Sequence, residues 1–246
     1  MSDLALITGG ANGIGRAVAL RMAAGGITVV IADYDDEAAK KVRGEITDAG
    51  GEAEAVGVNV TLASEVKTAV ADVLERRSRI DILANIAGGT IYRKPIEDLS
   101  WAEWKEVIDI NLKGTFLFCR EVAPVMQRQR AGRIINTSSN YGVTGSALRT
   151  PYSAAKAGVI AFSKSLALEM ATYGVLVNVV APGPTDTPRV LGHSTPEVRK
   201  LRANEIPLGR TGRPEDLAEA FYYLTTPESS WITGQTFHVN GGLVMP

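Results

Sequence analysis

Short, almost wholly apolar runs alternate with longer segments of helical periodicity along this chain. The apolar runs, which predict strands, lie at residues 4–8, 28–32, 53–60, 80–87, 132–138, 175–182 and 235–239. The segments that predict helices lie at residues 13–24, 36–49, 62–78, 101–130, 152–172 and 214–226. Strands that are apolar on both faces are typical of parallel sheets covered by helices on each side. The alternation therefore predicts an α/β fold, with a doubly wound parallel sheet of about seven strands and helices on both faces.

The same pattern gives no sign of a second domain. The chain has 246 residues, which is ordinary for one large domain, and no linker, repeat or low-complexity run divides it. Its longest irregular region, about 183–213, is rich in proline and glycine. Long connections of this kind are usually either functional lids or disordered segments.

Charge and cysteine content exclude several classes of function. With a net charge of −1, the chain has no long-range field to attract nucleic acid or an anionic membrane. It shows neither an apolar run of about 18 residues nor a signal-peptide pattern, so we expect a cytoplasmic protein without a membrane span. Its single cysteine, Cys119, excludes an internal disulfide and a cysteine-rich metal site, and its apolar neighbours indicate a position in the core or at an interface.

A glycine-rich turn, TGGANGIGRA at residues 8–17, follows the first predicted strand and opens the first predicted helix. Gly9, Gly13 and Gly15 let the backbone approach a ligand closely, and the helix N-terminus offers free N–H groups to a pyrophosphate. The spacing GxxxGxG differs from the general GxGxxG fingerprint. Because the turn stands in the strand-to-helix context that the motif requires, we interpret it as the dinucleotide-binding turn of a Rossmann-like fold.

Asp33, at the end of the second predicted strand, bears on which dinucleotide is bound. An acid here accepts hydrogen bonds from the adenosine ribose hydroxyls and repels a 2′-phosphate, although aspartate is also common in ordinary turns. Asn12 is neutral where a protein that binds NADP often carries a base, whereas Arg16 would favour NADP if it faced the phosphates. Together these residues favour NAD over NADP.

The stretch PYSAAKAG, residues 151–158, places Tyr152 and Lys156 on one face of a predicted helix. Such a pair is often only a packed ring and a solvated amine. A free phenol has a pKa of about 10, too high for a base near neutral pH, but a nearby ammonium stabilises its phenolate. An oxidised nicotinamide adds a second positive charge, which gives the pair the chemistry of a general acid/base.

In order and spacing, the motifs resemble those of the classical short-chain dehydrogenases/reductases over essentially the whole chain. The resemblance rests on TGGANGIG (8–15), NIAG (85–88), IN (110–111), INTSS (135–139), YSAAK (152–156), PGPTDT (182–187) and ITGQTFHVNGG (232–242). It implies a single dinucleotide-binding and catalytic domain over residues 1–246, with a substrate loop at about 183–213. It implies no metal, because the tyrosine replaces metal polarisation of the carbonyl.

The resemblance also assigns roles to individual residues. Tyr152 resembles the general acid/base, and Lys156 the residue that binds the nicotinamide ribose and lowers the pKa of the tyrosine. Ser139 is similar to the hydroxyl that holds the substrate oxygen, and Asn111 to the asparagine that supports a water-linked proton relay through the lysine. The implied cofactor-binding residues are Gly9, Asn12, Gly13, Ile14, Gly15, Asp33, Asn59, Val60, Asn85, Ala87, Gly88, Tyr152, Lys156, Pro182, Gly183, Thr185 and Thr187.

Two positions depart from the family pattern. Ile86 stands where a second asparagine is usual, and we expect little functional loss because Asn85 is kept. Asn59 stands where an aspartate commonly meets the adenine amino group. Its carbonyl can still accept from that amine, so we expect weakened recognition of the base.

The substrate is less determined by the sequence. Candidate lining residues follow the fourth strand, separate the serine from the tyrosine, or lie in the 183–213 region: Gly89, Thr90, Tyr92, Asn140, Tyr141, Gly145, Leu148, Arg149, Leu191 and His193. Arginine pairs well with a carboxylate, so Arg149 is a candidate for binding an acidic substrate. Solvent-facing positions are nevertheless more usual for residues such as Arg149 and His193.

Three functions remain open. The leading one is NAD(P)-dependent interconversion of a secondary alcohol and a ketone by hydride transfer, with NAD preferred. The alternative is an NADPH-dependent 3-oxoacyl-(acyl-carrier-protein) reductase; Asp33 opposes it, and so does Tyr173, near which those reductases often carry a base for docking the acidic carrier, while Arg130 is compatible with it. A dinucleotide-sensing binding protein with a vestigial site is disfavoured, because all four reactive residues are present.

The long predicted helices, 101–130 and 152–172, carry more apolar surface than one sheet face covers, which suggests a subunit interface. The resemblance adds the expectation of a homotetramer with 222 symmetry. The apolar C-terminal stretch NGGLVMP is expected to dock at another interface.

Overall fold

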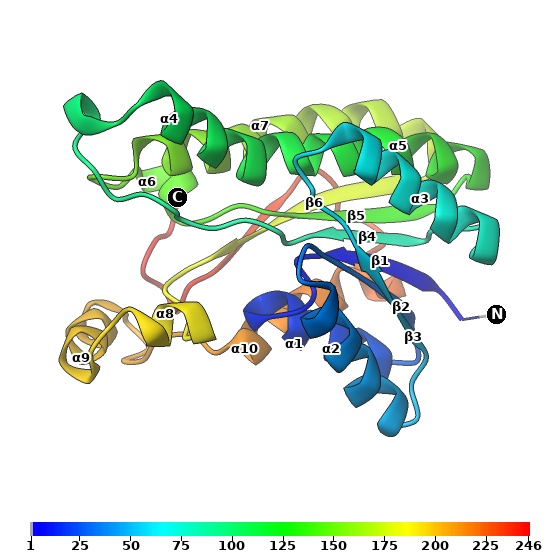
Figure 1. The fold of residues 1–246 in the computed structure, drawn as a ribbon, viewed down its shortest axis with the longest axis horizontal. Helices are drawn as coiled ribbons and strands as arrows, with labels where there is room; N and C mark the ends of the chain where they lie inside the picture. The colour runs from blue at the N-terminus through cyan, green and yellow to red at the C-terminus, as the bar shows by residue number, and fades with distance from the viewer. Residues whose placement is uncertain (1) are drawn as a thin grey trace.

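The sheet of this protein is parallel throughout (Figure 1). The computed structural model describes residues 2–246, and its strands are β1 (Leu4–Thr8), β2 (Thr28–Asp33), β3 (Ala53–Gly57), β4 (Ile82–Asn85), β5 (Gly132–Thr137), β6 (Val175–Pro182) and β7 (Thr236–Val239). They lie in the order β3-β2-β1-β4-β5-β6-β7. The chain thus winds outward from β1 in one direction and from β4 in the other, which confirms the predicted doubly wound sheet. Ligands bind in such sheets at the carboxyl ends of the strands, where the winding reverses.

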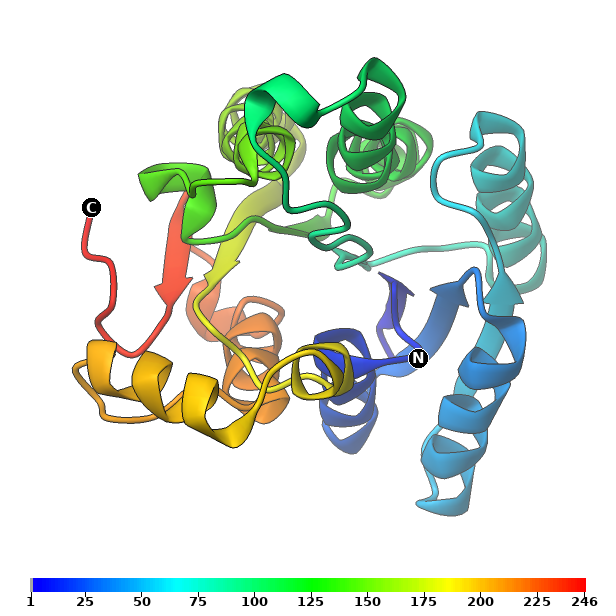
Figure 2. The same cartoon turned by 60° about the vertical axis from the view of Figure 1, so that its left-hand side comes forward.

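Helices cover both faces of the sheet (Figures 1 and 2). One face carries α1 (Gly13–Ala24), α2 (Asp36–Asp48) and α10 (Pro214–Tyr223); the other carries α3 (Ala63–Arg77), α5 (Gly114–Gln129) and α7 (Thr150–Met170). Shorter helices gather toward the carboxyl edge: α4 (Trp101–Ile108), α6 (Tyr141–Thr144), α8 (Pro188–Gly192) and α9 (Pro196–Glu205). Three 3₁₀ turns, η1 (Ile96–Asp98), η3 (Ala171–Tyr173) and η4 (Pro227–Ser229), and a π-helical turn, η2 (Asp109–Lys113), complete the regular structure. Among residues 2–246, no helix combines the length and the apolar character that crossing a bilayer requires.

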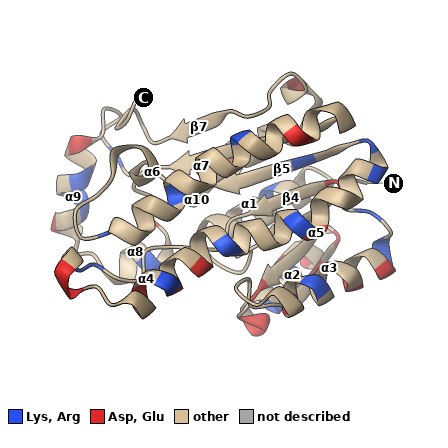
Figure 3. Ribbon diagram, turned by 90° about the horizontal axis from the view of Figure 1, so that it is seen from above, with Lys and Arg blue, Asp and Glu red and all other residues tan. Residues whose placement is uncertain are grey.

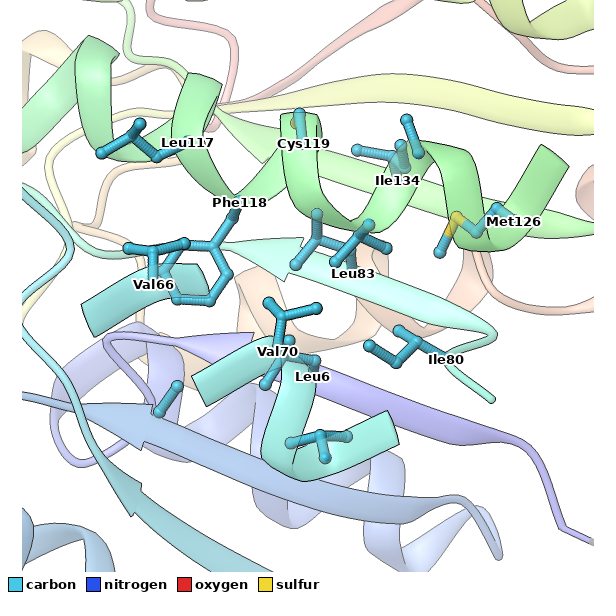
Figure 4. Packing of buried hydrophobic residues seen from close by; sticks show 14 of the residues in the cluster. Leu6, Val66, Val70, Ile80, Leu83, Leu117, Phe118, Cys119, Met126 and Ile134 are labelled. Carbon is cyan, nitrogen blue, oxygen red and sulfur yellow. The ribbon is translucent and has the colours of Figure 1, made fainter. Parts of the chain in front are cut away.

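Each face of the sheet has its own hydrophobic core. Successive residues of β1 point to opposite faces, so Leu6 joins the core that contains Phe118 of α5, whereas Ile7 joins the core that contains Phe221 of α10. Figure 4 shows the first of these cores. Cys119 is buried in it, in the first of the two positions that the sequence predicts. Burial of each large side chain stabilises the fold by roughly 1.5–3 kcal/mol, and the two cores hold the carboxyl edge rigidly between them.

Helices in the structure differ from the prediction in two regions. The helix predicted at 101–130 is divided into α4 and α5 by the π-helical turn η2. The region 183–213, predicted to be irregular, contains α8 and α9. Thr187 and Thr195 cap these two helices with their side chains, and a proline at the first helical position follows each cap.

Two strands end earlier than predicted, β3 at Gly57 and β4 at Asn85. The residues that follow them leave the sheet and line a cavity at its carboxyl edge. Apolar residues such as Val58 and Ile86 extend the strand pattern past the true strand ends, because they cover this cavity.

Candidate active site

Two adjoining cavities open at the carboxyl edge of the sheet. The larger cavity, of about 1080 Å³, is lined by the glycine-rich turn and by the ends of β2 and β4. The smaller cavity, of about 470 Å³, is lined by the end of β5, the start of α7 and the segment around α8 and α9. Gly88, Gly89 and Thr187 line both cavities. The site is therefore one elongated space, with room for a dinucleotide and a reacting group beside it.

The glycine-rich turn forms a cradle that side chains would fill. Gly9 and Gly13 have φ angles of +67° and +51°, which favour glycine. A Cβ on Gly15 would lie 1.9 Å from the carbonyl oxygen of Gly9, and a Cβ on Gly9 would lie 2.7 Å from the Cα of Ala87. Asn12 precedes α1 without a side-chain cap, so the first N–H groups of the helix remain available to an anion. These residues fit a bound pyrophosphate.

Asp33 ties the end of β2 to the glycine-rich turn. Its Oδ2 accepts a hydrogen bond from the backbone N–H of Ala11 at 3.1 Å, and its Oδ1 accepts from that of Asp35 at 3.2 Å. Each carboxylate oxygen keeps a lone pair, so the group is still able to accept from ribose hydroxyls in the larger cavity that it lines. Arg16, the residue that might have favoured NADP, pairs with Glu45 of α2 and lines neither cavity.

Two asparagines lie differently from their predicted roles. The carbonyl oxygen of Asn59 accepts from both the N–H and the hydroxyl of Thr61, at 3.0 and 2.8 Å. Both lone pairs are thus used locally, and the predicted bond from the adenine amine has no free acceptor there. Asn85 is buried beneath the cavities and lines neither; its Nδ2 donates to the Oδ1 of Asn136 at 2.9 Å. Its side chain braces β4 against β5 instead of contacting a cofactor.

The reactive groups meet where β5 ends and α7 begins. Ser139, Tyr152 and Lys156 all line the smaller cavity. The ammonium of Lys156 lies 5.8 Å from the ring centre of Tyr152 and donates to the carbonyl oxygen of Thr137 at 2.8 Å. Burial lowers the pKa of Lys156 to about 8. Burial also raises the pKa of Tyr152 above its usual value, and the hydroxyl of Ser139 acts in the opposite direction.

Asn111 lies behind this site, in the wide turn of η2. It is fully buried, and its Nδ2 donates to the carbonyls of Val107 and Gly89, both at 3.0 Å. Its Oδ1 accepts from the N–H of Gly89 at 2.8 Å. A Cβ on Gly88 would lie 2.5 Å from that same oxygen and 3.3 Å from the Nζ of Lys156. The asparagine side chain thus clamps the backbone next to the lysine, where only glycine fits.

The structure brings most of the predicted cofactor residues to the cavities. Those that line one or both are Gly9, Asn12, Gly13, Ile14, Gly15, Asp33, Asn59, Val60, Ala87, Gly88, Tyr152, Lys156, Pro182, Gly183, Thr185 and Thr187. Asn85 is the exception described above.

The predicted substrate residues divide into two groups. Lining the smaller cavity are Thr90, Asn140, Tyr141, Arg149 and His193, with Gly89 between the two cavities. Gly145, Leu148, Tyr92 and Leu191 do not line it. The Tyr92 hydroxyl donates to Glu106 of α4 at 2.6 Å, and Leu191 is exposed on α8. These two residues therefore turn away from the reacting groups.

Several residues at the site were not identified from the sequence. Ser138 donates to the carbonyl oxygen of Lys156 at 2.7 Å, and a Cβ on Gly142 would lie 2.8 Å from that residue's backbone. The doubled serine in INTSSNYG was the available signal for this support. The smaller cavity is also lined by four further arginines, Arg93, Arg189, Arg199 and Arg202. For Arg189, Arg199 and Arg202, the signal was the excess of basic over acidic residues between 189 and 202.

Comparison with known proteins agrees with this geometry. A family model described as enoyl-(acyl carrier protein) reductase matches residues 9–244. The chain is 44% identical to the 3-oxoacyl-(acyl-carrier-protein) reductase of Synechocystis sp., covering 99% of this chain and 98% of that one. It is 43% identical to the 3-oxoacyl-(acyl-carrier-protein) reductase FabG of Aquifex aeolicus, covering 98% and 96%. The crystal structure of gox2181, 34% identical, superposes with a TM-score of 0.94 over 98% of this chain and 95% of that one.

Proposed function

Because the chain belongs to the short-chain dehydrogenase/reductase family of nicotinamide-dependent oxidoreductases, we propose that it reduces the 3-oxo group of an acyl thioester to a secondary alcohol. One observation carries the chemistry: Ser139, Tyr152 and Lys156 converge in the smaller cavity, beside the space that fits a dinucleotide. The thioester substrate is supported by the names of relatives that share more than 40% identity over nearly their whole length. This favours the alternative function over the more general alcohol dehydrogenase.

In this proposal each reacting side chain has one task. The residues that line the larger cavity would hold a reduced nicotinamide dinucleotide, which would supply the hydride when bound. The Ser139 hydroxyl donates to the carbonyl oxygen of the substrate, and the Tyr152 phenol transfers its proton to that oxygen as negative charge develops on it. The pKa of about 8 leaves Lys156 mostly protonated at neutral pH, so its ammonium stabilises the phenolate that remains.

One exposed arginine, Arg130, supports a macromolecular carrier for the thioester. The guanidinium carbon of Arg130 lies 5.4 Å from the ring centre of Tyr173, and the arginine is exposed. Arg130 is therefore adjacent to Tyr173, near which carrier-binding reductases often have a base. One base is present there, which suits a negatively charged partner.

A second candidate function is an NAD-linked dehydrogenase of a secondary alcohol, which Asp33 favours. A carboxylate at the end of β2 repels a 2′-phosphate, and Arg16 is engaged by Glu45. The two candidates thus differ in substrate, and Asp33 favours NAD as the cofactor of either one.

Assays with acetoacetyl-CoA, cyclohexanone and cyclohexanol, each with both cofactors, separate the candidates. We expect kcat/KM for the acetoacetyl thioester to exceed that for cyclohexanone by at least roughly tenfold, as several more substrate contacts imply. Equal or better turnover of cyclohexanol and cyclohexanone would favour the second candidate. A tenfold preference for NADPH would contradict our interpretation of Asp33.

The carrier is tested with one variant. Arg130→Glu is expected to lower kcat/KM for an acetoacetyl-carrier-protein thioester by roughly tenfold and to leave acetoacetyl-CoA unchanged. An equal effect on both thioesters would contradict carrier docking at Arg130.

A further inference from the structure

Five arginines line the smaller cavity around the reacting groups. They come from separate segments: Arg93 follows β4, Arg149 precedes α7, Arg189 lies on α8, and Arg199 and Arg202 lie on α9. Figure 3 shows basic residues on α9, together with acidic ones. Only one carboxylate, that of Asp186, lines the same cavity among residues 2–246. The cavity wall is therefore strongly cationic, although the whole chain is nearly neutral.

None of these five guanidinium groups has a carboxylate partner within the described chain. The side chains that bond do so to neutral oxygens. Arg149 donates to the Ser146 hydroxyl at 2.7 Å, and Arg199 to the Ser194 carbonyl at 2.6 Å. Such bonds orient a guanidinium without neutralising its charge, although Arg199 also lies close enough to Glu197 for their charges to attract.

Two of the arginines, Arg93 and Arg202, act on a third, Arg149, through their charges. Arg149 is half-buried, and burial together with the nearby charges of Arg93 and Arg202 lowers the pKa of its guanidinium. Gathering like charges beside a partly buried one costs free energy that a bound anion would recover. Arginine also presents a planar fork that matches the oxygens of carboxylate or phosphate. Arg189 lines both cavities and donates to the Thr90 carbonyl. We therefore assign it neither to the anion nor to the dinucleotide.

An anion bound to Arg149 would lie close to the reacting groups. It stands three residues before Tyr152, about one helical turn away, and both side chains line the same small space. The Arg149 guanidinium also stacks over the Tyr141 ring, with 5.0 Å from its carbon to the ring centre. This contact holds the fork toward the wall of the cavity.

We propose that the substrate bears an oxyanion group, a carboxylate or a phosphate, that Arg149 binds with Arg93 and Arg202 near the reacting carbonyl. The inference rests on the proposed reduction, and it adds free keto acids, and thioesters with an anionic group close to the 3-oxo carbon, to the substrates.

Matched pairs of ketones test this proposal. Acetoacetate and levulinate are compared with their methyl esters, and acetoacetyl-CoA is compared with the uncharged acetoacetyl-N-acetylcysteamine thioester. We expect wild-type kcat/KM to favour the anion by roughly ten- to a hundredfold, mainly through KM, because a charged hydrogen bond is formed equally in the ground and transition states. A preference within the keto-acid pairs would support the proposal. A preference confined to the thioester pair would contradict an anion site near the carbonyl, because the phosphates of coenzyme A lie a pantetheine arm away from the 3-oxo group.

The variants Arg149→Gln and Arg202→Gln should bring the ratio of anion to neutral substrate close to one, while Arg128→Gln on α5 leaves it unchanged. The ratio is the readout because Arg149 also acts on the phenol of Tyr152, which affects both members of a pair alike. A ratio that both cavity variants leave unchanged would overturn the proposal, as would the absence of any preference in the wild type.

The proposed reduction and the proposed anion site can be tested separately. Turnover of the neutral ketones, lost in Tyr152→Phe, reports the reduction alone. If no ketone is turned over, calorimetric titration of levulinate and its methyl ester into the protein with reduced cofactor still decides the inference. At least tenfold tighter binding of levulinate, lost in Arg149→Gln, would support it, and equal binding would overturn it.

Discussion

The ammonium of Lys156 stands 5.8 Å from the ring centre of Tyr152 and is held by a backbone carbonyl, not by a carboxylate. Its positive charge is therefore uncompensated while the phenol is protonated. A phenolate would supply the missing negative charge, which is the electrostatic basis for proton release by Tyr152. The same arrangement makes the lysine costly to keep charged in the folded protein.

Replacement of Lys156 by methionine should remove a pH-dependent part of the free energy of unfolding. Burial lowers the pKa of Lys156 from 10.5 to about 8, so below pH 8 the folded protein carries the full cost of the buried cation. Between pH 8 and 10 the unfolded chain holds a proton that the folded protein has released, and stability rises with pH. Above about pH 10, the raised pKa of Tyr152 works in the opposite direction.

We therefore expect the wild type to gain on the order of 2–3 kcal/mol relative to Lys156→Met between pH 7 and 10. Urea unfolding of both proteins without cofactor, over this pH range, measures the difference. A constant difference would show that the lysine titrates near its ordinary pKa.

Tyr152→Phe should lower kcat by roughly a hundred- to ten-thousandfold, because it removes the proton donor. Cofactor affinity, measured by fluorescence titration, should change little. Tyr223→Phe on α10 is the matched control and should retain full activity. Substantial turnover by Tyr152→Phe would refute the acid/base assignment.

Gly88→Ala should lower both the free energy of unfolding and the catalytic activity. At a φ of +148°, the new Cβ would press on the Asn111 oxygen at 2.5 Å and approach the Lys156 ammonium at 3.3 Å. We expect a loss of about 1–3 kcal/mol in the free energy of unfolding. Gly44→Ala, within α2 and open to space, should instead stabilise by about 0.5–1 kcal/mol. Thermal unfolding compares the two, and equal effects would show that Gly88 is not constrained.

Asp33→Asn should raise kcat/KM with NADPH relative to NADH by roughly tenfold, because removing the charge relieves repulsion of a 2′-phosphate. The amide keeps only one acceptor for the two backbone N–H groups, so a loss of about 1 kcal/mol in stability is also expected. Asp48→Asn, at the far end of α2, should change neither quantity. An unchanged cofactor ratio in Asp33→Asn would remove Asp33 from cofactor choice.

The sheet and the reacting pair could be predicted because each has a local signature. Residues 4–8 are apolar on both faces, as a central parallel strand must be, and Tyr152 and Lys156 share a helix face by spacing alone. The caps of α8 and α9 were equally local, since Thr187 and Thr195 each precede a proline, yet the prolines were interpreted as signs of irregular structure.

Contacts between distant segments could not be predicted in the same way. The pairing of Arg16 with Glu45 depends on how α1 packs against α2, and the approach of Arg202 to Arg149 depends on where α9 lies. The predicted hydrogen bond from the adenine amine to Asn59 is opposed by a local contact, not by a distant one. The short-range bonds to Thr61 compete with a ligand for its carbonyl, and this competition was visible in the sequence.

The π-helical turn at Asp109–Lys113 sets the rotational phase between α4 and α5. One residue of an α-helix corresponds to a rotation of about 100°. The wider turn therefore lets α4 face α7 while α5 faces α3. It also lets the buried side chain of Asn111 bond to the backbone of Gly89. Deleting a single residue here would restore a uniform helix but rotate α5 away from its core. The chain should accordingly accept substitutions in this turn far more readily than any change in its length.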